Sequence, residues 1–417
     1  MSNRYLERHT ARLLLVAALF NGFIMSLGQT QDIIARKALM AKDWQLMVMM
    51  MIWPIANLGS IWWGRIFERS CNKSRYFLIA GVFGRLCLVY ALWLATMNEY
   101  LVMLTLMFSF NSLLIPAQNT IFQKNIDTTR RAKVYGYTIS LGMLVSIGVS
   151  FVAGRILDLN ENYFRYLLAG TGVAGFLSCL LLNRIRIKEE DPPRLCEKLN
   201  IREMLTDPLF RTIRLLKENK AFAAFERNFS IYGMGFIIMT PVIPIYLVNH
   251  LKLSYTTNFL AKGIISQVGL LLLSPYLGRL HDRIHPFRFI SIAFGMLVAF
   301  PVMIIISSLF VNVGFVAVGL VFIAYLMFGI AMAAVNISWN MSSIYFAGND
   351  EAAMYQSVHV TMTGIRGIIA PVLGFVLMKV FNIMAVFVAA GCFLATASIF
   401  SYRDFKRLRV KDLDFLP

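Results

Sequence analysis

The residues of this chain that could do chemistry are charged side chains inside long apolar runs. Arg366 and His359 lie seven residues apart in one such run, and Glu226 lies in another. An arginine near the centre of a bilayer costs roughly 3 kcal/mol, so ionisable residues placed there are functional candidates. Arg366 could donate hydrogen bonds to an anionic group. Glu226 and His359 could carry a proton between the two sides of a membrane.

Structural explanations for the same charges stay open. Arg366 could instead bond carbonyl groups and a neighbouring helix, and Arg85 is better explained that way. Lys262 could face a cavity or reach the membrane surface, and Asp32 is expected to be a residue at a helix end. Glu226 is the only acid well inside a predicted span. It could carry a proton if it is buried, and a structural role stays equally open.

The composition predicts the elements that must position these residues. The chain has 417 residues, of which 58% are hydrophobic and 15% charged, whereas soluble domains carry about 25% charged residues. This favours an all-α membrane protein with several spans. A net charge of +18 is explained by basic cytoplasmic loops, so no nucleic-acid partner is expected. The five cysteines form no CxxC pair, and we expect neither a disulfide framework nor a metal site.

Twelve apolar runs are long enough to cross a bilayer as helices. Most Lys and Arg fall in the N-terminal segment, the even-numbered loops and the C-terminal tail, which places both termini in the cytoplasm. The first run lacks a cleavage site and is expected to be a retained span. The predicted spans are 12–31, 44–64, 76–97, 99–121, 134–157, 164–184, 220–248, 255–278, 289–309, 313–341, 352–377 and 381–401.

A long loop divides the spans into two groups of six. We expect a bundle at 1–184, a cytoplasmic connecting loop at 185–218 and a second bundle with a short tail at 219–417. Apolar residues on one helical face predict a helix lying on the inner membrane surface within the loop: Leu209, Phe210, Ile213 and Leu216. The sequence Thr240–Pro244 is expected to break span seven near its outer end.

The two bundles share an internal repeat. The stretch Gly22–Met25 is similar to Gly235–Ile238, and Phe83–Leu86 is similar to Phe294–Leu297. Tyr135 and Gly154 in span five likewise correspond to Tyr355 and Gly374 in span eleven. The counterparts of His359 and Arg366 are Ile139 and Ser146, so the repeat itself does not require the two charges.

With this repeat, the chain resembles the major facilitator superfamily of secondary transporters. The most specific element is the loop Gly278–Arg288, where Gly278, Leu280, Asp282 and Arg283 fit the family's pattern. The corresponding first-half loop keeps basic residues, including Arg65 and Arg69, but has Gly64 where the family has an aspartate. The segment Pro116–Gly136 also looks like the family's turn between spans four and five.

The resemblance implies roles for two further sets of residues. The loops would gate the cytoplasmic face, with Gly278 allowing close helix approach and Asp282 meeting a helix N-terminus or an arginine. The gating set is Gly278, Asp282, Arg283, Arg65 and Arg69. Spans one, four, seven and ten would line the path, and their polar residues join the three charged candidates named above. The substrate-binding set is Arg366, His359, Lys262, Asn21, Asn111, Asn228, Tyr232, Asn336 and Trp339. Hydrogen bonding between helices is the alternative role for the amides.

The resulting expectation is secondary transport of a small solute with an anionic group, by alternating access in a bacterial inner membrane. Glu226 or His359 could couple this transport to protons, and Na⁺ coupling stays open. The alternatives are export of amphiphilic drugs or lipids, and a membrane sensor or assembly protein that does not transport. The sequence has no phosphate-binding GxxxxGK[ST], nucleophile elbow or HExxH. We therefore expect no enzyme activity and no cofactor. The protein is expected to be a monomer.

Overall fold

The computed structural model describes residues 3–59, 62–63, 74–187, 212–347 and 352–413, and every regular element in them is a helix. The chain divides into two compact units. Unit 1 comprises Met1–Thr206 and Ser254–Gly263, and unit 2 comprises Asp207–Leu253 and Ile264–Pro417. The boundary at Gly263 falls inside η5 (Leu260–Ile265), a segment of π-helix.

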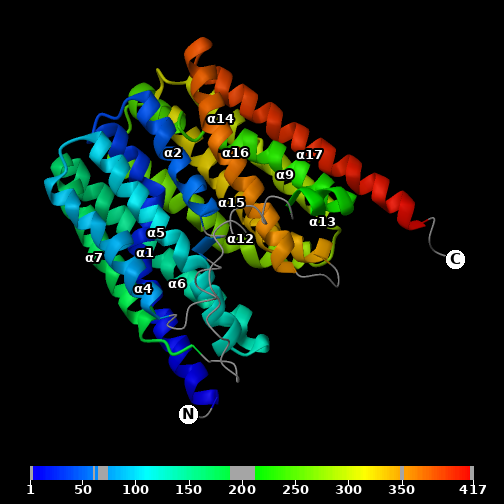
Figure 1. Cartoon of the computed structure of the whole chain (residues 1–417). Helices are drawn as coiled ribbons and strands as arrows, with labels where there is room; N and C mark the ends of the chain where they lie inside the picture. Colours follow the sequence, from blue (N-terminus) through cyan, green and yellow to red (C-terminus); the bar gives the residue numbers. More distant parts are fainter. Residues whose placement is uncertain (1–2, 60–61, 64–73, 188–211, 348–351, 414–417) are drawn as a thin grey trace. The chain divides into compact units, whose positions relative to one another are not determined.

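In unit 1, the long first helix forms the centre. Helix α1 (Asn3–Lys37) packs along α6 (Thr128–Leu159) and α7 (Phe164–Asn183), as Figure 1 shows. The predicted third span changes helix type along its length. The remaining elements are α2 (Asp43–Leu58), α4 (Arg75–Ile79), the π-helix η1 (Ala80–Arg85), the 3₁₀-helix η2 (Leu86–Trp93), α5 (Met97–Asn125), η3 (Glu161–Tyr163) and α11 (Tyr255–Phe259).

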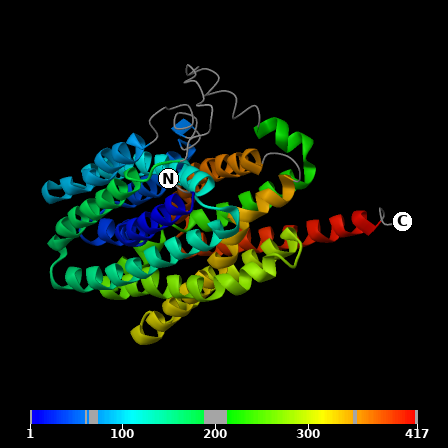
Figure 2. The same cartoon turned by 90° about the horizontal axis from the view of Figure 1, so that it is seen from below.

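In unit 2, α9 (Lys220–Ile238) packs against α16 (Ala352–Val380) and α17 (Ile383–Leu413). Helix α17 is continuous and leads to the C-terminus (Figure 2). Helix α12 (Ser266–His281) packs against α15 (Gly314–Ala347). The remaining elements are α10 (Ile243–Ile245), η4 (Tyr246–His250), α13 (Pro286–Leu297) and α14 (Ala299–Leu309).

The all-helical membrane architecture is confirmed. Eleven helical segments of the described chain are long and apolar enough to cross a membrane. Each agrees with one predicted span, and the twelfth, 44–64, is described only as far as α2 and Gly59, with Trp62 and Trp63. The count of twelve, the six-plus-six division and the cytoplasmic termini stay predictions.

One predicted break is present, and a proline in another helix leaves that helix continuous. Span seven breaks as expected, because α9 ends at Ile238 and α10 begins at Ile243. Pro371 lies inside α16, which continues through it to Val380. In the loop, residues 212–218 are helical, with Leu215 buried and Ile213 exposed. Leu209 and Phe210 lie outside the described residues.

Glycine controls how closely α12 and α15 pack. A Cβ on Gly329 would collide with the backbone carbonyl of Ser266, whereas one on Gly319 of the same helix would meet nothing within 4 Å. We expect Gly329→Ala to destabilise the protein by about 1–3 kcal/mol, because the backbones must separate. Gly319→Ala, the matched control, should leave the unfolding temperature in detergent unchanged or slightly raised. Equal unfolding temperatures for both variants would contradict the packing described here.

Candidate functional site

The predicted proton carriers form a buried pair in unit 2. Glu226 of α9 and His359 of α16 place Oε1 and Nδ1 2.6 Å apart, and both side chains are 1% exposed. The other two polar atoms, Glu226 Oε2 and His359 Nε2, are buried without a hydrogen-bond partner. The two residues therefore contact each other through one short hydrogen bond, and each keeps one polar atom that could bind a further group.

The N-terminus of α9 positions Glu226. Asn219 caps the helix, because its side-chain oxygen accepts a hydrogen bond from the Phe222 amide at 2.9 Å. The Asn219 side-chain nitrogen donates to the Tyr355 hydroxyl of α16 at 3.2 Å. One residue thus starts α9 and holds it against α16, one turn before His359.

Arg366 lies two helical turns after His359 on α16, and it is only 5% exposed. Its Nη1 donates to the Phe229 carbonyl at 2.6 Å, and its Nη2 donates to the Thr363 hydroxyl at 2.8 Å. Nε is buried without a partner, and the guanidinium makes no ion pair within the described part of the chain. Glu226 is close enough to interact with it electrostatically. We call Glu226, His359 and Arg366 the charge cluster.

Two glycines allow α9 and α16 to approach closely beside the charge cluster. A Cβ on Gly233 would overlap the Arg366 side chain, which crosses α9 at that residue. A Cβ on Gly374 would overlap the carbonyl of Ile238. Small residues on both helices therefore allow this contact, as they commonly do in membrane bundles.

Aromatic rings enclose the charge cluster. The His359 ring lies 4.8 Å from the Phe229 ring, 5.5 Å from Trp339 and 6.1 Å from Phe225, measured between centroids. The Arg366 guanidinium lies 5.9 Å from the Phe229 centroid, a cation–π distance. In such an apolar surrounding, any net charge on the cluster is costly.

The other predicted residues of unit 2 are dispersed. Tyr232 is buried, interacts with Arg366 and stacks on Phe294 at 4.5 Å. Asn336 is exposed and its carbonyl accepts from the Asn340 side chain. Of the polar residues predicted here, Tyr232 and Trp339 thus adjoin the charge cluster, and Asn336 has no described contact with it.

Asn228 belongs to a different network. Its side chain donates to Asp404 at 2.8 Å and accepts from Arg227 at 3.1 Å, while Arg227 also pairs with Asp404 at 2.6 Å. Asp404 lies in the candidate span Ile383–Arg407. Asp404 lies three residues before the end of that segment and beyond the predicted span 381–401, so Glu226 stays the only acid well inside a predicted span.

Lys262 lies in unit 1, where it forms an ion pair with Asp32 of α1. Both side chains are largely buried, so Asp32 is more than a residue at a helix end. Nearby, Asp158 accepts hydrogen bonds from the backbone amides of Tyr255 and Thr256 at 2.7 and 2.9 Å. These two acids attach Ser254–Gly263 to α1 and α6.

Removing one member of the Asp32–Lys262 pair should leave a buried charge. We expect Asp32→Asn and Lys262→Met each to lower stability by about 3 kcal/mol, and the double variant to recover most of the loss. The measurement is the unfolding temperature in detergent, treated as a double-mutant cycle. Additive losses would show that the two charges do not depend on each other.

Asn21 and Asn111 meet in unit 1 through a third residue. Arg85, which is 3% exposed, donates from Nη2 to Asn111 Oδ1 at 2.6 Å and to Asn21 Oδ1 at 3.3 Å. Both amides are half-buried. The sequence favoured a structural role for Arg85 and did not connect it to either asparagine.

The proposed gating residues are only partly described, since Arg65 and Arg69 lie outside the described residues. Asp282 follows the last residue of α12, is 81% exposed and has one ionic contact, with His281 at 3.6 Å. Arg283 is also exposed. A Cβ at Gly278 would meet nothing within 4 Å among the described residues, so the close approach expected there stays a prediction.

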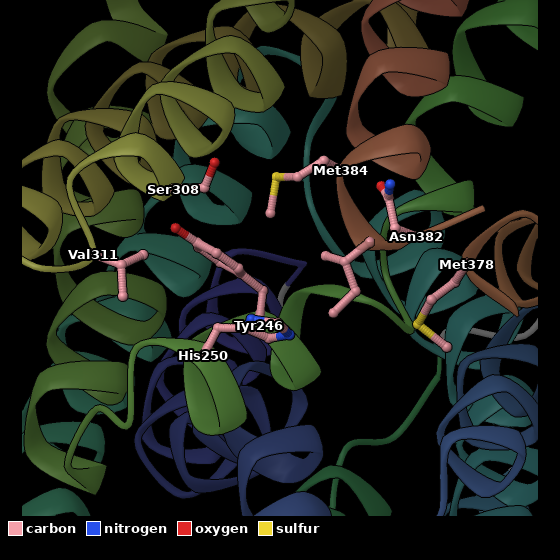
Figure 3. Close-up of a pocket in the computed structure, with 8 residues that line it drawn as sticks. Tyr246, His250, Ser308, Val311, Met378, Asn382 and Met384 are labelled. Atoms are coloured by element: carbon pink, nitrogen blue, oxygen red, sulfur yellow. The ribbon is translucent and has the colours of Figure 1, made fainter.

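Two hollows lie away from the charge cluster. In unit 2, Tyr246, His250, Ser308 and Met384 line a hollow of about 480 Å³, shown in Figure 3. In unit 1, α1, α6 and α7 enclose a hollow of about 660 Å³ with an almost wholly apolar lining. Its walls include Phe20, Phe23, Leu27, Val149, Leu168 and Ala174. The sequence predicted neither hollow.

Comparison with known proteins agrees with this fold. The model of the Major Facilitator Superfamily matches residues 14–371. A search of curated proteins finds no match. Among solved structures, a POT family transporter in complex with 5-aminolevulinic acid is similar with a TM-score of 0.74 and 14% identity, covering 94% of this chain and 96% of that one.

Two other solved structures are also similar. For a mutant of the nucleoside transporter NupG the TM-score is 0.72 with 14% identity, covering 96% of this chain and 100% of that one. For a D-xylose-proton symporter it is 0.62 with 15% identity, covering 96% of each chain. Identities this low show the fold alone, whereas the family match covers most of the sequence. The chain belongs to the major facilitator superfamily, whose members are transporters and not enzymes.

Proposed function

We propose that the protein is a proton-coupled secondary transporter of a small solute that carries an anionic group. The observation that supports this is the charge cluster, in which a buried Glu226–His359 pair lies near a buried Arg366 that has no ion pair among the described residues. The solute would cross by alternating access. The membrane would be the bacterial inner membrane, with the basic loops on its cytoplasmic side.

The charge balance of the cluster explains how a proton could favour anion binding. With Glu226 ionised, His359 neutral and Arg366 positive, the cluster carries no net charge. One added proton, on either Glu226 or His359, gives it one positive charge. Because the surroundings are apolar and aromatic, that charge is costly until an anion binds nearby and compensates it.

Coupling follows from the same balance. If the proton strengthens anion binding, the anion must strengthen proton binding by the same factor. The cluster then carries no net charge in two states: when it holds both the proton and the anion, and when it holds neither. In these two states the protein can change conformation in the membrane at low cost. Proton and anion would move together in a ratio of one to one.

Arg366 is the proposed first contact of the anion, through its unpartnered Nε. Two arms of the guanidinium already hold the Phe229 carbonyl and the Thr363 hydroxyl. These bonds fix the side chain in place, so binding would cost little side-chain entropy. Tyr232 and Trp339, beside the cluster, would contact the rest of the solute. Asn336 keeps the path-lining role implied by the family. Asn228 is engaged with Asp404 and is left out of this site.

The solved structures are consistent with a small polar solute. They are a nucleoside transporter, a POT family transporter in complex with 5-aminolevulinic acid and a D-xylose-proton symporter. These are several solute classes on one fold, so the fold does not choose among them. The anionic group is proposed from the cluster, and the coupling ion from the Glu226–His359 pair.

Transport of an amphiphile is the second candidate, favoured by the apolar hollow in unit 1. Its volume of about 660 Å³ is within the range of small-molecule sites. A sensor that does not transport would be favoured by a permanent ion pair at Arg366, and the described residues provide none. The cluster therefore supports transport over sensing.

A ligand screen followed by an uptake assay tests the proposal. The purified protein is screened by thermal shift against carboxylates, phosphates, sulfonates, neutral metabolites and amphiphiles, because a ligand of the folded state raises its stability. We expect stabilisation by an anionic solute, and faster uptake of it into proteoliposomes under an inward proton gradient. Stabilisation by amphiphiles alone would select the second candidate.

A further inference from the structure

We propose that Arg85 is a positioning residue that turns Asn21 and Asn111 into a donor site for a carboxylate or a similar oxyanion. The three side chains come from η1, α1 and α5 of unit 1. The site would give the solute's anionic group a contact outside the charge cluster. It rests on the proposed function for its role in transport, but its existence can be tested by binding alone.

The charge of Arg85 has no counter-charge within the described part of the chain. The side chain is 3% exposed and makes no ion pair there. Nε and Nη1 are buried without a hydrogen-bond partner, and only Nη2 is used. The thiols of Cys87 and Cys179 also lie near the guanidinium, and a thiol is a weak acceptor. The group formed by Arg85, Asn21 and Asn111 thus keeps a positive charge.

The chemistry of arginine decides how the two amides face. A guanidinium has donors and no acceptor, so each asparagine must turn its oxygen towards Arg85 and its NH₂ group away. Neither NH₂ group has a hydrogen-bond partner among the described residues, and neither is among the fully buried unpartnered atoms. Both amides are half-buried, whereas Arg85 is buried behind them. The arrangement offers two NH₂ groups backed by a positive charge.

The backbone around Arg85 is adapted to hold it. Arg85 ends the π-helix η1, and the 3₁₀-helix η2 follows at once. Such short departures from α-helix often mark functional sites. On α7, a Cβ at Gly172 would meet the Arg85 carbonyl at 2.8 Å, and one at Gly175 would meet its Cδ at 3.0 Å. Both glycines therefore leave the space that Arg85 occupies.

A group that only accepts hydrogen bonds is the best match for this site. A carboxylate oxygen can accept from both NH₂ groups and gains from the positive charge behind them. A primary amide can accept hydrogen bonds from the two NH₂ groups only through its single oxygen, and it carries no charge. We therefore expect the site to prefer a carboxylate over the corresponding primary amide.

The test measures the unfolding temperature of the purified full chain with sodium acetate, with inorganic phosphate, and with sodium chloride or acetamide as controls at equal ionic strength. Acetate or phosphate should raise it more than the controls do. Arg85→Met should lose most of this shift, and Arg85→Lys should keep part of it. No selective shift in the wild-type protein would overturn the proposal.

Asn111→Asp separates a binding role from a structural one. The change is nearly isosteric and gives Arg85 an ion pair, so the unliganded protein should unfold at a higher temperature. It also replaces the NH₂ donor by a carboxylate oxygen, so the acetate shift should disappear. If Asn111 only holds Arg85, the shift would persist, and the proposal would be wrong.

Failure here can be told apart from failure of the proposed function. Glu226→Gln removes proton coupling in the proposed function but does not touch the Arg85 site, so the acetate shift should remain. A lost shift in Asn111→Asp together with intact proton-driven uptake would leave this site without a role in transport. An intact shift in Asn111→Asp overturns the donor site and leaves the charge cluster unaffected.

Discussion

Glu226→Gln should abolish solute accumulation driven by a pH gradient while leaving solute exchange intact. Glutamine has the shape of the protonated acid, so the charge cluster would stay permanently in its positive, anion-binding state. Accumulation should fall at least ~10-fold, within the usual range of coupling free energies. The assay compares pH-driven uptake with counterflow of labelled solute in proteoliposomes.

Glu226→Asp is the matched control for this prediction. It keeps the carboxyl group on a shorter side chain and should retain part of the proton-driven uptake. His359→Gln leaves ionisable Glu226 to take up the proton, so it should weaken proton-driven uptake without abolishing it. Unchanged accumulation in Glu226→Gln would show that the proton binds elsewhere.

Arg366→Met should weaken binding of anionic solutes more than any other substitution in unit 2. The change removes the positive charge and leaves ionised Glu226 in an apolar surrounding without compensation. We expect the apparent affinity to fall at least ~10-fold, and stability to fall by about 3 kcal/mol. Affinity is measured by thermal shift with the solute found in the screen, and stability by the unfolding temperature without it.

Two further variants serve as controls for Arg366→Met. Arg366→Lys keeps the charge but loses the paired bonds to the Phe229 carbonyl and the Thr363 hydroxyl, so it should retain part of the binding. The double variant Glu226→Gln with Arg366→Met carries no charge at either position and should recover stability without recovering binding. If the single Arg366→Met variant binds anionic solutes normally, Arg366 has only a structural role.

Hydrophobic runs made the helices predictable, because a membrane span must be both apolar and about 20 residues long. Even the break at Thr240–Pro244 could be predicted, since proline removes a backbone donor. Helix type within a span could not be predicted: the π-helix that ends at Arg85 packs against α5 and α7, and the hydrophobic pattern of the span does not encode those contacts. The extension of α17 to Asp404 was missed because polar residues end the apolar pattern before the helix ends.

The sequence indicated which charges matter but not their partners. Glu226 and His359 were each predicted to carry a proton, and their contact joins residues 133 positions apart. Asp32 and Lys262 are 230 positions apart, and Arg227 and Asp404 are 177 apart. Such pairs are set by tertiary packing. Thr363 could have been suggested, because it lies three residues before Arg366 and so on the same helix face.

The most direct test of the charge cluster is proton movement driven by the solute alone. Wild-type proteoliposomes start with equal pH on both sides, and the anionic solute from the screen is added outside while a trapped dye reports internal pH. Proton–anion coupling predicts that the interior acidifies with the wild-type protein and not with Glu226→Gln, although both exchange the solute. Equal acidification by both proteins, or none by the wild-type protein during net uptake, would contradict it.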